Sequence, residues 1–355
     1  MARLGRLDEP IAGVVDIESI HADGKTDFRR GTLMKHAGYS LVVAATLIAA
    51  ASGFAQTPSW TPPADSARCP SKWGAGDERG AANHMKPQSV VDAARLIRTG
   101  EVVELGRVLN ANMPNFTGRS YKLIHKRIYL GGHVIGANRL SANEEVVEAE
   151  IGQVGTQFDG FAHISHENSF YNCFKYEDIA TPSGFTKLGI QNVGMLFTRG
   201  VLIDVAAYKG VEMLGDTYEI TVADIEGALS RQNMTLRAGD AVLIHTGWGR
   251  LWGVDNARSA KSNPGIGIAA AEWLIAKDPM LLGSDDWGIE VVPNPNEQLA
   301  FPVHQLALTT NGIHLLENMK LDELAAKRAY EFAFIVQPLK LEGATGSTVA
   351  PVAVR

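Results

Sequence analysis

The stretch from Gly152 to His163 reads GQVGTQFDGFAH, and it decides how the rest of the chain is interpreted. It places Asp159 four residues before His163, which offers a carboxylate oxygen and an imidazole to a divalent metal. Alone the pair is weak evidence, because an acid followed four residues later by histidine arises by chance in roughly one protein of this size out of two or three. The plainer interpretation is a capped turn with a hydrogen-bonded histidine.

The residues around this pair favour a functional site. Gly155, Gly160 and Ala162 are small enough to let another backbone approach closely. Phe158 and Phe161 can wall the site against water, and we expect Phe161 to contact a bound substrate. These neighbours therefore predict a dry, closely packed pocket around the acid and the histidine.

A second cluster lies between Phe301 and Met319, FPVHQLALTTNGIHLLENM. It holds His304, His314 and Glu317 among leucines and an isoleucine that are typical of a core. A carboxylate in so apolar a stretch is costly to bury unless it is paired or bound to a cation. Glu317 is therefore a candidate metal ligand, and a helix-end cap or an ion pair with Lys320 is the alternative.

The first stretch resembles the signature of the cyclase family of metal-dependent hydrolases, H-x-G-T-H-x-D-x-P-x-H. This family includes bacterial kynurenine formamidase and isatin hydrolase. The positions that match the signature are Gly155, Thr156, Asp159 and His163. Gln153 and Gln157 replace the first two histidines, and Phe161 replaces the proline. The paired glutamines resemble a Q-x-G-T-Q-x-D-G branch of the same family, so they do not indicate decay.

Other segments carry the resemblance along nearly the whole chain that follows the N-terminal region. They are KWGAGDERGAAN, FYNCF, TRGVLIDV, HQLALTTNGIHLLEN and GATGSTVAPVAV. The resemblance implies a mixed α/β fold of the swivelling β/β/α type in a single domain. It also implies that Asp159 bridges two metal positions, that His304 and Glu317 complete the second position, and that His163 donates and accepts the proton.

The two glutamines weaken the first metal position, because an amide oxygen is neutral and binds zinc less well than imidazole does. We therefore expect one well-occupied divalent metal per chain, manganese or zinc. Its expected protein ligands are Asp159, His304, Glu317 and, more weakly, Gln157. Gln153 is expected to orient Asp159 or to bind the carbonyl of the substrate.

Other polar and aromatic residues are weaker candidates. Phe116 ends the segment Met113 to Phe116, which resembles an early substrate-contacting loop of the family, and its ring could stack on an aromatic substrate. His166 is a candidate pocket residue, with a solvated loop as the alternative. The run Asp285 to Trp287 either shapes the substrate site or caps a turn. His245 ends an apolar run and is interpreted as a satisfied core histidine.

Composition limits the class of protein. The chain has 355 residues, with 33 basic and 39 acidic side chains and a net charge of −6, which gives no basic patch for nucleic acid. Two cysteines, Cys69 and Cys173, are too few for a thiolate zinc site but allow one disulfide in an oxidising compartment. No Gly-x-Ser-x-Gly motif is present, so a serine nucleophile has no support.

The N-terminal region predicts export. The apolar, alanine-rich run from Tyr39 to Ala55 follows Lys35 and ends in small residues that a signal peptidase needs. The run is short for a membrane anchor, which is the rival interpretation. Met1 or Met34 could be the initiator, and Arg29-Arg30 weakly resembles a twin-arginine signal. We divide the chain into an extension with its signal (1–55), a linker (56–63) and one hydrolase domain (64–355).

Hydrophobic patterning predicts alternating helices and strands after the linker. The expected helices are Pro87 to about Gly100, Val222 to Ser230 and Ile268 to Ala276. The expected strands are Val102 to Leu109, Arg127 to Leu130, Glu145 to Ile151, Val201 to Val205, Ala241 to Ile244 and Tyr330 to Val336.

These observations predict an exported, metal-dependent hydrolase that attacks carbon–nitrogen bonds other than peptide bonds in a small, aromatic molecule. Arylformamide or cyclic amide opening is the first choice, with lactone hydrolysis or ring-forming cyclase activity as the alternative within the family. A metal-free periplasmic binding protein on the same scaffold is the alternative from another class. We expect a small-molecule partner, a homodimer or homotetramer, no nucleic acid and no stable membrane anchor after cleavage.

Overall fold

The computed structural model describes residues 60–116, 118–127 and 134–355. The predicted export signal from Tyr39 to Ala55 lies outside these residues. Among the described residues, no helix has the length and apolar character that a membrane crossing requires.

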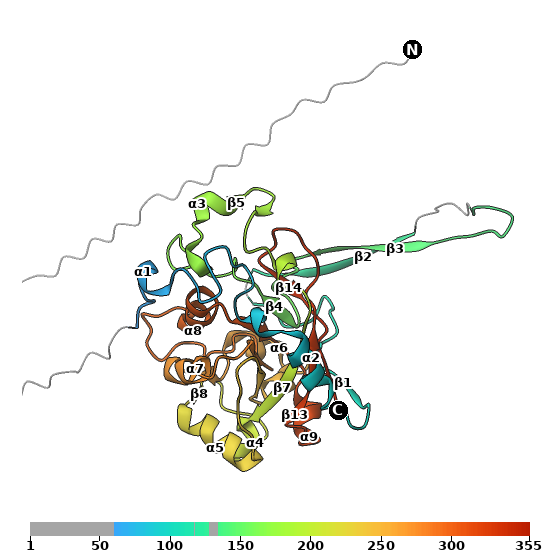
Figure 1. The fold of residues 1–355 in the computed structure, drawn as a ribbon. Helices are drawn as coiled ribbons and strands as arrows, with labels where there is room; N and C mark the ends of the chain where they lie inside the picture. Colours follow the sequence, from blue (N-terminus) through green and yellow to red (C-terminus); the bar gives the residue numbers. More distant parts are fainter. Residues whose placement is uncertain (1–59, 117, 128–133) are drawn as a thin grey trace, which may run out of the picture. The chain divides into compact units, whose positions relative to one another are not determined.

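Within the described part of the chain, nine strands form the main sheet (Figure 1). In spatial order they are β1 (Val102–Glu104), β15 (Val352–Val354), β13 (Glu331–Val336), β7 (Leu196–Asp204), β9 (Ala241–His245), β11 (Leu281–Ser284), β12 (His314–Glu317), β4 (Gln157–Asp159) and β14 (Gly346–Thr348). The four central strands β7, β9, β11 and β12 are parallel, and antiparallel strands flank them on both sides. The mixed α/β fold expected from the sequence is therefore confirmed.

The central strands are almost wholly buried because both faces of the sheet are covered. On β7, Val201 and Ile203 pack into one core with α5 (Val222–Gln232) and α7 (Ile268–Ile275). The intervening Leu202 packs into a second core on the opposite face, with α9 (Asp322–Ala326). This alternation follows the two-residue period of a strand. The sheet thus has a core on each side.

Shorter elements complete the unit. The further helices are α1 (Asp65–Arg68), α2 (Pro87–Ala94), α3 (Tyr176–Ile179), α4 (Val205–Lys209), α6 (Asn256–Lys261) and α8 (Pro302–His304), with a π-helix at Gln305–Asn311. Four 3₁₀ turns lie at Gly80–His84, Tyr171–Cys173, Ile190–Asn192 and Trp248–Leu251 among the described residues. Two small ladders pair β5 (Ala180–Thr181) with β6 (Gly184–Phe185), and β8 (Glu219–Ile220) with β10 (Gly265–Ile266).

A long hairpin, which we name the arm, consists of β2 (Tyr121–Arg127) and β3 (Asn143–Ala149) and projects from the main sheet (Figure 1). It pairs with no other strand among the described residues. Its pairs Leu123–Val147 and Ile124–Val146 stand on opposite faces, and all four of these side chains are exposed. The arm therefore presents apolar side chains to solvent on both faces.

Several boundaries differ from those expected. The helix after Pro87 ends at Ala94 rather than near Gly100. The strand expected to reach Leu109 stops at Glu104, because beyond it the N–H of Arg107 donates to the hydroxyl of Thr156, 2.9 Å away, and leaves the ladder. Of the strand expected from Arg127 to Leu130, Arg127 is the last residue of β2, which starts at Tyr121, and the rest lies outside the described residues.

A candidate metal centre beside an aromatic pocket

The pairing of β4 with β12 builds the centre. The antiparallel register sets Gln157 opposite Glu317, and Asp159 opposite Leu315. Because side chains alternate along a strand, Gln157 and Asp159 point to the same face as Glu317. Phe158 between them points the other way and is buried in the core. The two stretches singled out in the sequence thus meet in space, although more than 150 residues separate Asp159 from Glu317 in the chain.

Glu290 holds the third residue, His304, in place. Its carboxylate accepts the backbone N–H groups of Val303 and His304, at 3.2 and 3.0 Å, at the start of α8. It also accepts the Nδ1–H of His304 at 2.7 Å. With Nδ1 engaged, Nε2 faces the site, 3.1 Å from Glu317 Oε1 and 3.8 Å from Asp159 Oδ2. A carboxylate behind a histidine is the usual arrangement for a metal ligand.

The three residues fit a divalent cation. Their ligand atoms lie within 4.8 Å of one another, and all three side chains are buried. Asp159 Oδ2 is buried and has no hydrogen-bond partner among the described residues. Burial and the nearby Asp159 charge raise the pKa of Glu317. Two buried carboxylates that share one space are unfavourable unless a positive charge lies between them, and a bound cation supplies it.

The two glutamines support the carboxylates. Gln153 Nε2 donates to Asp159 Oδ1 at 2.9 Å, and Gln157 Nε2 donates to Glu317 Oε2 at 2.7 Å and to Gln153 Oε1 at 3.3 Å. Carboxylates only accept hydrogen bonds, so the amide nitrogens must face them. The hydrogen bond from Gln153 fits the expected orienting role toward Asp159, which stays a prediction. It turns the NH₂ group of Gln157 toward the centre, whereas the predicted ligand role requires its oxygen.

His163 lies at the edge of the centre. Its Nε2 is 4.0 Å from Asp159 Oδ2, and its ring centroid is 6.3 Å from that of His304. The side chain keeps 17% of its surface exposed, so water can reach it. Burial lowers the pKa of His163, which outweighs the opposite effect of Asp159. The imidazole is therefore neutral near pH 7 and free to accept a proton.

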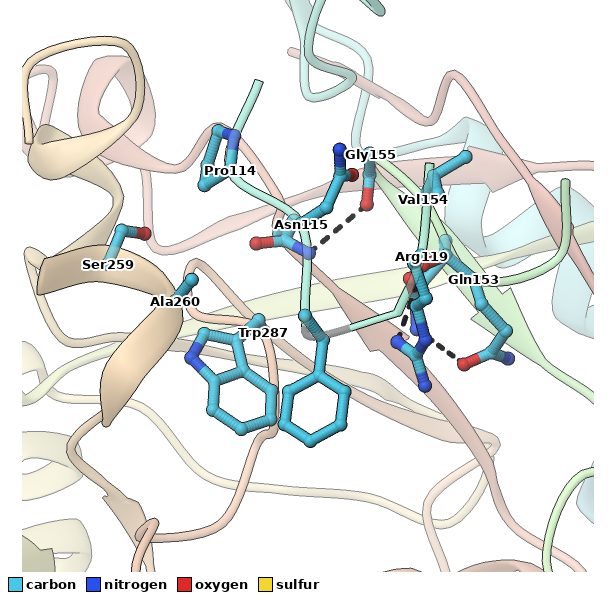
Figure 2. A pocket seen from close by; sticks show the side chains of 12 residues that line it. Pro114, Asn115, Arg119, Gln153, Val154, Gly155, Ser259, Ala260 and Trp287 are labelled. Carbon is cyan, nitrogen blue, oxygen red and sulfur yellow. Dashed lines mark hydrogen bonds between the residues drawn. The ribbon is translucent and has the colours of Figure 1, made fainter. Parts of the chain in front are cut away.

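A pocket opens beside the centre (Figure 2). Its lining includes Gln153 and Gln157, the two glutamines that donate to the carboxylates of the centre. The rings of Phe116 and Trp287 lie 5.0 Å apart on one wall. Aromatic walls with a few polar groups are typical of small-molecule sites. Phe116 therefore lies where the sequence placed it, in a pocket next to the candidate ligands.

The structure places two predicted pocket residues elsewhere. Phe161 is only 1% exposed and stacks on His314, with 4.0 Å between ring centroids, and against Tyr171. The chain turns at Gly160 after β4, which carries Phe161 into the core instead of the pocket. His166 lies in a turn that its backbone closes with Ser169, and it is not among the residues that line the pocket.

The remaining candidates separate clearly. Asp285 accepts hydrogen bonds from the N–H and the hydroxyl of Thr246, both at 2.7 Å, and Asp286 accepts backbone N–H groups of the turn that follows it. Both acids therefore cap turns, and only Trp287 of this run lines the pocket. His245 is a buried core histidine that is only half satisfied: Nδ1 is bonded to Asp204 at 2.8 Å, whereas Nε2 has no hydrogen-bond partner among the described residues.

Two residues at the site, Glu290 and Arg119, were not predicted from the sequence. Glu290 sits between Ile289 and Val291, so it carries the signal that pointed to Glu317, a carboxylate in an apolar run. Arg119 lines the pocket, and no pattern in its exposed, polar surroundings marks it.

The chain matches the family described as "Putative cyclase" over residues 103–291. A crystal structure described as a novel cyclase is 33% identical, covers 80% of this chain and 98% of its own, and superposes with a TM-score of 0.72. Isatin hydrolase A from Ralstonia solanacearum is 23% identical, with coverage of 76% and 97% and a TM-score of 0.51. An isatin hydrolase bound to the product analogue thioisatinate is 22% identical, with coverage of 76% and 98% and a TM-score of 0.53. No curated protein matched the chain.

Proposed function

The chain belongs to the cyclase family, and from this premise we propose that it is a metal-dependent hydrolase of small aromatic amides. One observation carries the proposal: a buried Asp–His–Glu group with an unpartnered carboxylate oxygen lies beside a pocket with aromatic walls. The isatin hydrolases among the structural neighbours share the fold and make amide opening the first chemistry to test.

The reaction divides between the centre and His163. A cation bound by Asp159, His304 and Glu317 would polarise the substrate carbonyl and lower the pKa of a water molecule. His163 takes one proton from the attacking water and returns it to the leaving nitrogen, as a C–O bond forms and the C–N bond breaks. The neutral imidazole beside Asp159 suits the first of these steps.

The substrate class follows from the pocket. Phe116 and Trp287 can hold a planar ring, while the neighbouring glutamines mark the end where the carbonyl reacts. Arylformamides and cyclic aryl amides meet both requirements. Lactones or a ring-closing substrate are the alternative within the family. An assay with a panel of all these compounds distinguishes the alternatives, because the compound that is converted identifies the substrate class.

Metal loading and turnover test the proposal together. Protein purified without chelator is dialysed against EDTA, reloaded with Mn²⁺, Zn²⁺ or Mg²⁺, and assayed with formanilide, isatin and an aryl lactone. We expect activity that disappears with chelator and returns with one of the metals. Failure to bind any metal under all loading conditions would instead favour the metal-free binding protein.

Export remains a proposal with structural support. Cys69 and Cys173 form a disulfide with 6.0 Å between their Cα atoms, and disulfides persist in oxidising compartments such as the periplasm. Sequencing the N-terminus of the protein from an exporting bacterial host should give a start near Gln56. A soluble cytoplasmic product that retains Met1 or Met34 contradicts the proposal.

Self-association is likewise proposed, as a homodimer or homotetramer. An isolated two-stranded hairpin is marginally stable in water, and the arm exposes Leu123 at 54% and Val146 at 49%. A second copy of the chain would cover these side chains. Light scattering should show an oligomer for the unaltered chain and a monomer for Leu123→Asp with Val146→Asp, whereas a monomer at every concentration contradicts the proposal.

A further inference from the structure

Arg119 is the one charged side chain in the pocket that the proposed reaction does not use. Along the sequence it lies between Phe116 and β2. Its guanidinium points toward Gln153 (Figure 2). The guanidinium carbon lies 5.3 Å from the centroid of the Phe116 ring. Arg119 is therefore close both to the ring of Phe116 and to the backbone carbonyl of Gln153.

Most of the hydrogen-bonding capacity of this guanidinium is unused. Nη1 donates to the carbonyl of Gln153 at 3.3 Å, and within the described residues Arg119 forms no ion pair with a carboxylate. An acid to consider here is Glu150, whose pKa is lowered chiefly by a hydrogen bond from Ser120 and least by the charge of Arg119. Its carboxylate accepts from the backbone N–H of Ser120 and not from Arg119. An arginine has five N–H donors in a rigid fork that matches a carboxylate in two parallel hydrogen bonds.

A second polar group nearby also lacks a partner, since Asn115 Oδ1 is buried in the pocket without a hydrogen bond among the described residues. Among the described residues, the pocket therefore offers an aromatic wall, an amide oxygen without a hydrogen bond and a guanidinium without an ion pair around one space.

We infer that Arg119 binds a carboxylate carried by the substrate, so that the preferred substrates are aromatic amides with an acidic group on the ring or on a side chain. This inference rests on the proposed function and narrows its substrate class. The ring lies against Phe116 and Trp287, an N–H of the substrate reaches Asn115 Oδ1, and the carboxylate meets the guanidinium. A carboxylate formed from the scissile carbonyl would have the same chemistry but would appear only in the product.

Matched substrates separate these two sources of the carboxylate. Kinetics are measured with 2-formamidobenzoate, its methyl ester and formanilide, which release formate from the same bond and differ in the ring acid. For the acid, Arg119→Met should raise KM roughly 10- to 100-fold with kcat within about threefold, because a hydrogen-bonded charge pair at a binding site is worth about that much. For the two neutral compounds KM should change little.

Two further variants guard the interpretation. Arg119→Lys keeps the charge but loses the planar fork, so it should restore only part of the affinity for the acid. Arg95→Met, at an exposed arginine that follows α2 and lies outside the site, should match the unaltered chain. Equal losses on acid and neutral substrates, or no loss on either, overturn the inference.

If the protein hydrolyses none of the formamides, a measurement of ligand binding tests the inference instead. Calorimetry with 2-aminobenzoate and with aniline, on metal-free and metal-loaded protein, reports recognition of the acid directly. The unaltered chain should bind 2-aminobenzoate more tightly, and Arg119→Met should lose that preference. A retained preference in folded Arg119→Met overturns the inference, whereas lost turnover with an intact, Arg119-dependent preference counts against the hydrolase proposal alone.

Discussion

Asp159 has a buried carboxylate that folding alone does not explain. One of its oxygens accepts from Gln153 at 2.9 Å, and the other is buried without a partner among the described residues. An unsatisfied buried carboxylate oxygen costs several kcal/mol by general estimates, so stability alone does not explain it. A cation bound to this oxygen would offset that cost.

The substitution Glu317→Gln tests whether Glu317 is a metal ligand. The change keeps the shape and removes the charge, so it should weaken metal binding strongly while the metal-free protein unfolds at a similar denaturant concentration. Elemental analysis and urea unfolding measure the two effects. Bound metal and activity that survive this change would show that Glu317 is not a ligand, and His304→Ala should behave in the same way.

His163→Ala should separate proton transfer from metal binding. The side chain lies 4.0 Å from Asp159 and outside the buried ligand group, so metal content should stay unchanged. Turnover should fall by roughly 10²- to 10⁴-fold, the usual contribution of a positioned acid or base. Asp159→Asn is the contrast, because it should remove metal and activity together. Metal loss in His163→Ala would show that it is a ligand.

The glutamines make a third prediction at this scale. With Gln153 and Gln157 as donors to carboxylates, we expect one tightly bound metal per chain. Replacing both by histidine supplies imidazole ligands and should raise zinc content toward two per chain. Elemental analysis of both proteins after zinc loading decides it, and two tightly bound zinc ions in the unaltered chain would refute the single-metal expectation.

At the scale of elements, the sequence indicated which residues come together but not the elements that hold them. His304 and Glu317 stand out as polar side chains in an apolar stretch, and the resemblance to the cyclase family implied that they act together with Asp159; the structure groups the three. The strand β4 was not predicted, since three residues carry no readable period. The π-helix from Gln305 to Asn311 was also missed, because its apolar pattern is compatible with helix or strand.

The long, apolar strands were the easiest to place. β9 and β13 fall within one residue of the expected bounds, because continuous burial on two faces leaves an unbroken apolar run. Contacts between distant segments were out of reach of local patterns. The packing of Phe161 on His314 is an example, since a two-residue turn after β4 decides which face Phe161 occupies.

Neighbouring elements also set a pH dependence through His245 at the end of β9. Burial alone would lower its pKa, but the charge of Asp285, the hydrogen bond to Asp204 and the carboxylate of Asp322, 3.8 Å from Nε2, outweigh this and raise the pKa to about 10. Asp204 and Asp322 are the neighbours whose pKa values fall, and the cations Arg107 and Arg250 lie close to Asp322. The protonated form of His245 therefore stabilises the folded chain.

The sign follows from proton binding. The folded state keeps its proton up to about pH 10 while the unfolded histidine loses it near 6.5, so the contribution is complete below pH 6.5 and is lost as pH rises toward 10. The loss is at most about 1.4 kcal/mol per pH unit. Urea unfolding from pH 6 to 10 should show a steeper decline for the unaltered chain than for His245→Gln, and parallel curves would contradict the assignment.

For the whole molecule, the disulfide Cys69–Cys173 joins the segment before the sheet to the loop that follows the metal-binding stretch. It closes a sequence separation of 104 residues. Cross-links over loops of this length stabilise by about 2–4 kcal/mol in most proteins. Cys69→Ala with Cys173→Ala should therefore unfold at a lower denaturant concentration, and adding reductant should affect only the unaltered chain. Equal stability of the two proteins would show that the cross-link contributes little.

The proposed contact between copies at the arm would place assembly next to the pocket. Arg119 precedes β2 by two residues, Gln153 follows β3 by four, and both line the pocket. By thermodynamic linkage, any factor by which a partner bound to the arm alters ligand affinity is the factor by which the ligand alters the affinity for that partner. Ligand affinity would depend on protein concentration across the range in which the oligomer forms, and saturating ligand would shift the subunit dissociation constant in step.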